Sequence, residues 1–211
     1  MTAPAIDAKR FALDPSQYFP EVQKKDLIVL HFTAGSTASG AHAWWGSDKG
    51  RVATAYIVDL DGVIYQTFHP AHWAYHLGMP KDNPGFINDR RSIGIEIVNV
   101  GPLRRSLDGK QLNWWPKAFT TKFCGVGEKG SYVKAPFRGF EYFAAFRPEQ
   151  VSAVSGLVAH LRDRFKIPGT LPADVAGYTP RHIGLASHQN FRADKSDIGP
   201  AWDWTPYKEP L

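Results

Sequence analysis

The stretch DLIVLHFTAGST, residues 26–37, decides how the chain begins to fold. Within it, Leu27–Phe32 is apolar at every position except His31, which is the pattern of a strand covered on both faces. Small and polar residues follow at once, so the strand ends just beyond the histidine. Loops at strand ends are where α/β proteins tend to place their chemistry. His31 is therefore a candidate functional residue, although a lone histidine of this kind is more often structural.

The rest of the chain mixes strands with helices. Hydrophobic pattern and turn signals predict four further strands, Tyr56–Asp59, Val63–Phe68, Ser92–Val100 and Arg181–Ser187. The first two flank an Asp-Gly turn, which is typical of a β-hairpin. A short helix is predicted at Ser39–Trp45. A long helix opens at Pro148 and ends before Pro168, with apolar residues at helical spacing: Val151, Val154, Leu157, Val158, Leu161 and Phe165.

These elements predict an α/β fold with a mixed central β-sheet flanked by helices. Residues 101–147 carry many glycines, prolines and aromatic side chains, and we predict an irregular long loop or insertion there. The chain has 211 residues and no internal repeat. We therefore expect one domain, residues 1–211, and a monomer.

Charge and composition narrow the classes of partner. The chain has 25 Lys and Arg against 20 Asp and Glu, a net charge of +5. This positive charge favours a polyanionic binding partner, which could be nucleic acid, anionic lipid or an anionic cell-wall polymer. An ordinary soluble protein can also carry such an excess of positive charge. The single cysteine, Cys124, excludes an internal disulfide and a zinc site built on several thiolates.

The start of the chain, MTAPAIDAKRFALDP, lacks the apolar segment of a secretory signal. No apolar run approaches the roughly 20 residues that span a bilayer. We therefore expect a protein without a membrane span that is cytoplasmic as synthesised.

The polar tail after the last predicted strand carries further candidates for chemistry. His188, Lys195 and Asp197 lie within ten residues of one another. Like His31, His188 closes an apolar strand. Two histidines and a carboxylate could supply three ligands of a tetrahedral zinc ion, with the fourth position left to water. Taken singly, each of these residues also has a structural explanation.

Glu96 lies between two isoleucines in a strand that is predicted to be buried. An unpaired carboxylate there is costly, so it should be ion-paired, near a metal, or protonated. The structural alternative is an ordinary salt bridge to one of the many arginines, for example Arg90 or Arg91. Gly94, on the same face, leaves room for a ligand above the strand. A carboxylate that faces a pocket can act as a general base for metal-assisted hydrolysis.

Four segments of the chain resemble the zinc-dependent N-acetylmuramoyl-L-alanine amidase family, whose fold is shared with the peptidoglycan recognition proteins. The segments are IVLHFTAGST, the hairpin AYIVDLDGVIYQ with the downstream AYHLG, RRSIGIEIVN, and SHQNFRADKSDIGPAWDW. They occur in the family's order and span about residues 27–204. Residues 101–147 are the least similar part.

The resemblance implies a role for each candidate. His31, His188 and Asp197 would bind one zinc ion per chain. Glu96 would be the catalytic glutamate, and Lys195 would stabilise the transition state. His76 would correspond to a histidine of the substrate groove.

The chain departs from the family's pattern in two places. Ala55 and Thr54 stand where many relatives have a histidine or a tyrosine. The interval from His188 to Asp197 is about one residue shorter than in some relatives. The resemblance therefore assigns the residues of the substrate groove beside the zinc less directly than it assigns the metal ligands.

The implied reaction is hydrolysis of the amide bond between N-acetylmuramic acid and L-alanine, in peptidoglycan or a muropeptide. Absence of a signal fits both a phage endolysin, released through a holin, and a cytoplasmic muropeptide-recycling amidase. A non-catalytic peptidoglycan-binding module and a nucleic-acid binder are further alternatives, the latter supported only by charge. The charge and the aromatic segment 101–147 favour a polymeric wall. Several tryptophans could stack on sugar rings or serve packing: Trp44, Trp45, Trp73, Trp114 and Trp115.

Overall fold

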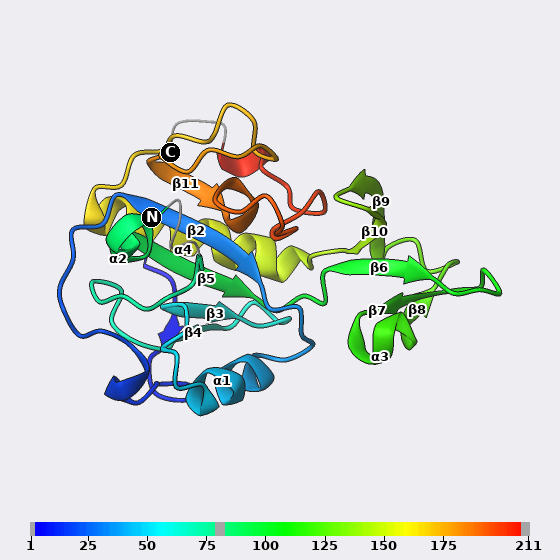
Figure 1. The fold of residues 1–211 in the computed structure, drawn as a ribbon, viewed down its shortest axis with the longest axis horizontal. Helices are drawn as coiled ribbons and strands as arrows, with labels where there is room; N and C mark the ends of the chain where they lie inside the picture. The colour runs from blue at the N-terminus through cyan, green and yellow to red at the C-terminus, as the bar shows by residue number, and fades with distance from the viewer. Residues whose placement is uncertain (1–2, 79–82, 208–211) are drawn as a thin grey trace.

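The computed structural model describes residues 3–78 and 83–207, which form two β-sheets joined by short connections (Figure 1). The main sheet has six strands in the order β1-β4-β3-β5-β2-β11. Their bounds are β1 Ile6–Asp7, β2 Leu27–Phe32, β3 Tyr56–Val58, β4 Ile64–Gln66, β5 Ser92–Ile97 and β11 Gly184–Ser187. Three helices accompany this sheet, α1 Ala38–Ser47, α2 Ile87–Arg91 and α4 Pro148–Phe165.

The main sheet is mixed, as the sequence predicts. β2 lies between β5 and β11 and is parallel to both, while β3 and β4 form the antiparallel hairpin around the Asp-Gly turn. The observed β2 matches the predicted strand at both ends. β11 begins at Gly184, three residues later than predicted, and both hairpin strands are shorter than predicted.

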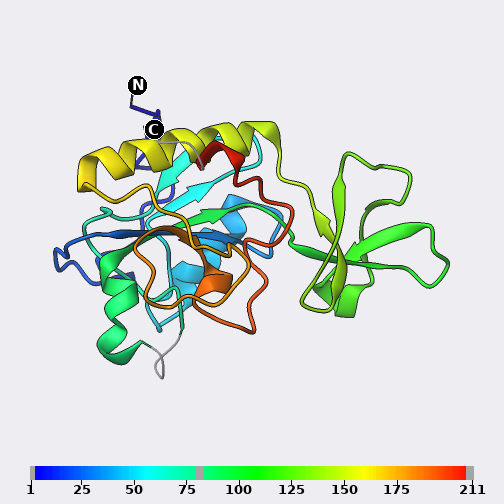
Figure 2. The same cartoon turned by 90° about the horizontal axis from the view of Figure 1, so that it is seen from above.

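Helix α4 covers one face of the main sheet (Figure 2). The middle of its apolar stripe is fully buried against the isoleucines of β5 and the even-numbered residues of β2: Val154, Leu157, Val158, Leu161, Ile28, Leu30, Ile93, Ile95 and Ile97. Burying each such side chain stabilises the fold by roughly 1.5–3 kcal/mol. Because neighbouring residues of a strand point to opposite faces, the odd-numbered residues of β2 are left for the other side of the sheet.

The second face carries a smaller apolar cluster of Leu27, Val29, Leu77, Ala186 and Phe191. This cluster covers the amino-terminal part of β2. His31, two residues beyond Val29, points to the same face at the strand's far end. One face of the sheet therefore supplies the core, and the end of the other face is available for a site.

Residues 102–144, which we call the small lobe, form a second sheet that stands apart from the first (Figure 2). Its strands follow the order β8-β7-β6-β10-β9, with bounds β6 Pro102–Arg105, β7 Gln111–Trp114, β8 Thr121–Gly125, β9 Tyr132–Phe137 and β10 Phe140–Ala144. All pairings are antiparallel. The short element α3, Pro116–Phe119, contains left-handed backbone at Lys117 and Ala118.

The prediction of irregular structure for residues 101–147 is therefore wrong. The small lobe has a hydrophobic cluster of its own, with Leu103, Leu112, Cys124 and Tyr142 at its centre. Its strands are short and only partly buried, so they lack both the continuous apolar run of β2 and the regularly spaced isoleucines of β5. That residues 1–211 make up a single domain stays a prediction.

Two side chains fasten the small lobe to the main sheet's loops. The indole nitrogen of Trp115 donates a hydrogen bond to the carbonyl of Ala34, just beyond β2. The guanidinium of Arg138, at the turn between β9 and β10, donates to the carbonyls of Gln189 at 3.2 Å and Arg192 at 2.8 Å. The lobe is thus held against the loops that follow β2 and β11. No helix of the described residues has the length and apolarity of a membrane span.

The connection from β5 into the lobe depends on Gly101. Its backbone is left-handed, with φ of 75°, and a Cβ there would lie 2.6 Å from the Phe32 ring. Gly101→Ala should therefore lower the free energy of unfolding by more than the roughly 1–2 kcal/mol of the backbone effect alone. Chemical denaturation measures this change.

Gly139→Ala is the matched control. Gly139 is also left-handed, with φ of 83°, but a Cβ there would meet no atom within 4 Å. It should show the backbone effect without the steric one. Equal losses in the two variants would mean that the approach of Phe32 to Gly101 contributes nothing.

Candidate active site

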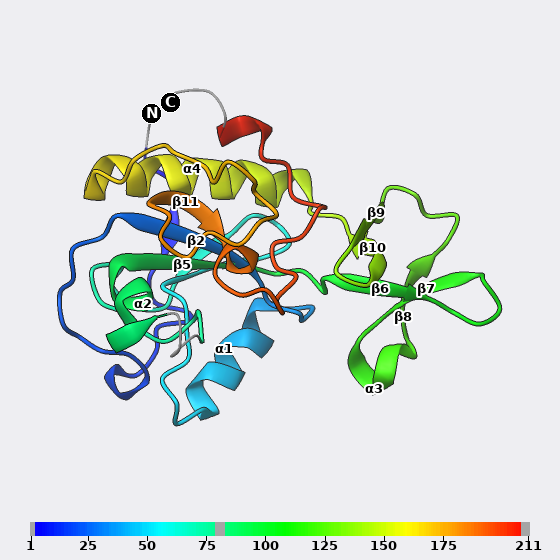
Figure 3. The same cartoon turned by 45° about the horizontal axis from the view of Figure 1, so that its top comes forward.

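The candidate site lies where the parallel strands β2, β5 and β11 end (Figure 3). His31 of β2 is in register with Glu96 of β5, so their side chains point to the same face. His188 follows β11 directly. Carboxyl ends of parallel strands meet at one edge of a sheet, and this topology gathers three residues that are far apart in sequence.

Three of the predicted residues form a tight cluster of ligand atoms, His31, His188 and Asp197. The two histidine Nδ1 atoms lie 3.1 Å apart. Oδ2 of Asp197 lies 3.2 Å from Nδ1 of His31 and 2.9 Å from Nδ1 of His188. Ligand atoms on a tetrahedral zinc ion are about 3.3–3.6 Å apart, so this triangle is only slightly tighter than a zinc site. All three residues are buried.

The outer nitrogens of both imidazoles have partners that leave Nδ1 free for a metal. Nε2 of His188 donates to the carbonyl of Leu77 at 3.2 Å. Nε2 of His31 lies 2.9 Å from Nδ1 of His76, whose own Nε2 lies 2.7 Å from the Ser92 hydroxyl. Both Nδ1 atoms face Oδ2 of Asp197, and the tautomer in which each Nε2 carries the proton would leave both Nδ1 lone pairs available to a cation. Hydrogen bonds of this kind orient metal-binding histidines.

Electrostatics favour the protonation states that a metal needs. Burial, together with the neighbouring His188, lowers the pKa of His31 to about 4, so its imidazole is neutral at neutral pH. Burial alone would raise the pKa of Asp197, but the charges and hydrogen bonds of His188 and His31 lower it overall. The neutral imidazole of His31 and the carboxylate of Asp197 are donor types that suit zinc.

Glu96 is half-buried beside this cluster and lines the cleft. Desolvation, with the charge of Asp197 adding to it, raises the pKa of Glu96 to about 8, while Lys195 opposes the shift. Within residues 3–78 and 83–207, Glu96 makes no ion pair. Arg91 pairs instead with Asp26 at 2.8 Å, and Arg90 lies over the Trp73 ring. The structural alternative for Glu96, a salt bridge to either arginine, is therefore wrong.

Lys195 also lines the cleft, on the loop that carries Asp197. Hydrogen bonds fix this loop: Gln189 N–H donates to the carbonyl of Asp197 at 2.7 Å, and Arg138 donates to the carbonyl of Lys195. Sequence reasoning missed Arg138, because its partners lie some fifty residues away and nothing nearby in the sequence marks it.

His76 has contacts that the sequence does not predict. It lines the cleft, as a groove residue would, but it also touches His31 and Ser92. The space above Gly94 is filled: a Cβ there would lie 2.8 Å from Thr54 and 3.2 Å from Nδ1 of His76. Gly94 therefore makes room for neighbouring side chains, and the prediction that it leaves room for a ligand is wrong.

A cleft of about 810 Å³ extends from the cluster. Its aromatic lining comes from both parts of the molecule: Trp44 and Trp45 from α1, and Trp114, Trp115, Phe119 and Phe140 from the small lobe. Trp73, in contrast, stacks on Phe19 with ring centroids 3.9 Å apart and serves packing. The remaining histidines that the sequence offers, among them His42, His160 and His182, contribute nothing to the cluster.

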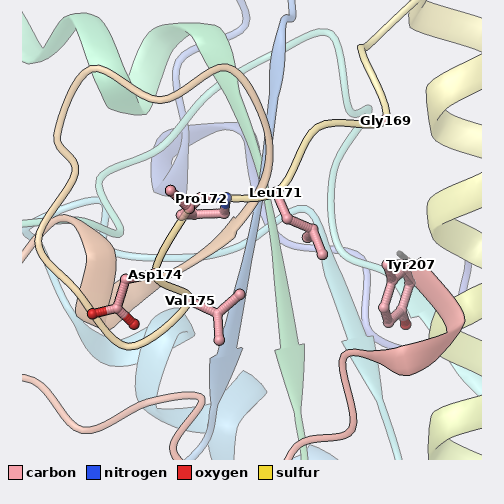
Figure 4. A pocket seen from close by; sticks show the side chains of 7 residues that line it. Gly169, Leu171, Pro172, Asp174, Val175 and Tyr207 are labelled. Atoms are coloured by element: carbon pink, nitrogen blue, oxygen red, sulfur yellow. The ribbon is translucent and has the colours of Figure 1, made fainter. Parts of the chain in front are cut away.

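Another pocket, of about 470 Å³, lies beside α4 (Figure 4). Its lining includes Leu171, Val175 and Tyr207, with Asp174 as the one acidic side chain. The Asp174 carboxylate accepts a hydrogen bond from the backbone of Ala176. No histidine and no second carboxylate line this pocket, so it has no cluster of metal ligands like that of the cleft.

A mixed α/β sheet whose strand ends gather two histidines and a carboxylate beside a second carboxylate is typical of metal-dependent hydrolases. The chain belongs to the N-acetylmuramoyl-L-alanine amidase family, whose sequence profile matches residues 21–200. It is therefore a peptidoglycan amidase. No curated protein sequence matches the chain.

Solved structures of amidases and lysins share the fold. A mutant of PlyL is 15% identical, with a TM-score of 0.52, and the match covers 90% of this chain and 85% of that one. The amidase LysC from Clostridium intestinale is 15% identical, with a TM-score of 0.51 and coverage of 98% and 96%. AmiD from E. coli, in complex with an anhydromuramyl peptide, is 20% identical, with a TM-score of 0.53, and the match covers 89% of this chain and 58% of AmiD.

The raised pKa of Glu96 predicts how the stability of metal-free protein depends on pH. The folded protein keeps this proton up to about pH 8, whereas the unfolded chain releases it near the ordinary pKa of 4.5. The contribution of Glu96 to stability is therefore complete below pH 4.5 and is lost as pH rises towards 8. Glu96→Gln removes this dependence.

Thermal unfolding in the presence of a chelator, at several pH values, measures the effect. The melting temperature of Glu96→Gln minus that of the parent should increase from pH 5 to pH 8. Histidine titrations occur in both proteins and cancel in this difference. A difference that stays constant with pH would contradict the raised pKa.

Proposed function

We propose that His31, His188 and Asp197 bind one zinc ion per chain, and that Glu96 and Lys195 carry out amide hydrolysis beside it. The observation that carries the proposal is the convergence of three buried donor atoms within about 3 Å of one another. Without a cation, three atoms that carry lone pairs, two imidazole nitrogens and a carboxylate oxygen, face one another with few protons available to form hydrogen bonds between them. A divalent ion satisfies all three at once.

Zinc in this place supplies Lewis acidity to the amide carbonyl and to a water molecule. We assign the proton transfers to Glu96, whose carboxylate a cation bound beside it would hold in the ionised form. The carboxylate accepts a proton from the attacking water and later donates it to the departing alanine nitrogen. The bond between the lactyl carbonyl carbon and that nitrogen breaks, giving a carboxylate on the muramic acid and a free amino group on L-alanine.

Two further residues complete the proposed machinery. The ammonium group of Lys195 would stabilise negative charge on the carbonyl oxygen as water adds. His76 would contact the substrate and, through Nδ1, hold the ring of His31 in position. We further propose that the protein acts on the cell wall as a monomer that is released to it, as an endolysin is.

The non-catalytic alternative finds no support in this site. A binding module of this fold needs neither a full set of three metal ligands nor a carboxylate with a raised pKa beside them. Here all three candidate ligands converge, and Glu96 lines the same cleft. The nucleic-acid alternative rested on net charge alone.

The metal proposal predicts that purified protein carries about one zinc ion per chain and that His188→Ala loses most of it. Elemental analysis after dialysis measures this content. His76→Ala is the matched control, because His76 lies next to the ligands without being one of the three converging donors. We expect it to keep most of its zinc through the same dialysis. Full occupancy in His188→Ala would show that the ligand set is wrong.

The role of Glu96 predicts a variant that folds but does not catalyse. Glu96→Gln keeps the shape of the side chain but cannot accept the proton, so hydrolysis should fall by about 10²–10⁴-fold. Zinc content should stay near that of the parent, and the melting temperature should match or exceed it, because a half-buried carboxylate is removed. Release of stem peptides from peptidoglycan measures the activity. Near-parent activity in this variant would reject Glu96 as the base.

A further inference from the structure

The small lobe carries all of the chain's net charge. Residues 102–144 contain eight Lys and Arg against three Asp and Glu, whereas the rest of the chain contains 17 of each. Of these eight cations, only Arg138 is turned inwards, onto the loop of Lys195. The other seven are exposed: Arg104, Arg105, Lys110, Lys117, Lys122, Lys129 and Lys134.

The lobe is also continuous with the catalytic cleft. Trp115, Phe119 and Phe140 line the same cleft as Glu96. Trp115 on the lobe is 52% exposed and Trp44 on α1 is 57% exposed, so each part of the molecule adds a partly exposed tryptophan ring to the cleft lining. Flat rings of this kind offer an apolar surface with a polar handle.

The basic side chains extend well beyond the cleft. The turns that join β6 to β7 and β8 to β9 project away from the main sheet (Figure 2). Lys110 lies in the first of these turns and Lys129 in the second, with Lys122 on β8 between them. None of these three lysines lines the cleft, so a ligand confined to the cleft would not touch them. Only an extended ligand can contact the cleft and the outer lysines together.

We propose that the small lobe is a binding surface for polymeric peptidoglycan, whose glycan strand leaves the cleft along the aromatic side chains while carboxylates of neighbouring stem peptides meet the outer lysines. This inference rests on the proposed function and names its substrate as the intact wall polymer. The chemistry fits on two counts. Stem peptides repeat carboxylates along the polymer, and the lobe presents cations with few acidic groups between them.

Binding to purified sacculi tests the proposal. In a Glu96→Gln background, which holds the polymer without cutting it, Lys110, Lys122 and Lys129 are changed together to Gln. Co-sedimentation should show about tenfold weaker binding to sacculi and a smaller loss of binding when salt is added, since exposed charges are screened by salt. The control variant changes Lys9, Lys24 and Lys166 to Gln. These are exposed residues outside the lobe, and the loss of net charge is the same.

If binding depends on where the charges lie, the lobe variant should bind sacculi more weakly and the control variant should bind them like the parent. Equal weakening in both would show that net charge alone governs binding, and the proposal would be wrong. Sacculi stripped of phosphate-containing polymers should still bind the parent. Loss of binding after stripping would identify a phosphate polymer as the ligand and overturn the assignment to stem-peptide carboxylates.

Activity measurements separate this inference from the proposed function. With Glu96 intact, the ratio of sacculus hydrolysis to hydrolysis of a soluble muramoyl peptide should fall about tenfold in the lobe variant and stay constant in the control. An unchanged ratio in the lobe variant would contradict the inference even if hydrolysis is normal. A parent that cleaves neither substrate would instead reject the proposed function.

Discussion

The parallel pairing of β2 with β5 and β11 is the constraint on which the rest of the structure depends. It places His31 and Glu96 in register on one face and brings the residue after β11 to the same edge. The opposite face of the same strands is packed against α4. A shift of one residue in the register of β2 would turn His31 towards the core and an apolar side chain towards the cleft, so packing and site geometry are fixed together.

This constraint explains which parts of the fold could be predicted from the sequence. β2 is apolar at every position but His31, and β5 repeats isoleucine at every second position, so both strands are easily recognised. α4 is amphipathic and opens at a proline, and both of its ends agree with the prediction. The small lobe gave no such signal, since half-exposed strands of four to six residues, interrupted by tight turns, look irregular in composition.

In the site, too, some residues could be predicted from the sequence and others could not. A histidine at the end of a buried strand and a glutamate between isoleucines are unusual enough to be noticed in the sequence, and both lie on the cleft. The grouping of His188 and Asp197 with His31 needed the resemblance to a known family, because spacing alone left a structural explanation open. The contact of His76 with His31 and the hold of Arg138 on the Lys195 loop depend on distant parts of the chain. No local pattern could have shown them.

The small lobe begins and ends at nearly the same point. The side-chain amide of Asn99 donates to the carbonyls of Ala144 and Ala145, and the Ala144 N–H donates to the carbonyl of Gly101. The entire segment thus closes on itself before α4 begins, and its length is not set by the main sheet. Closing a longer loop costs little additional entropy, so a segment attached in this way can be lengthened, shortened or exchanged while the catalytic sheet stays the same. In an amidase built like this one, the small lobe and its specificity for the wall could change in evolution while the residues that break the amide bond stay the same.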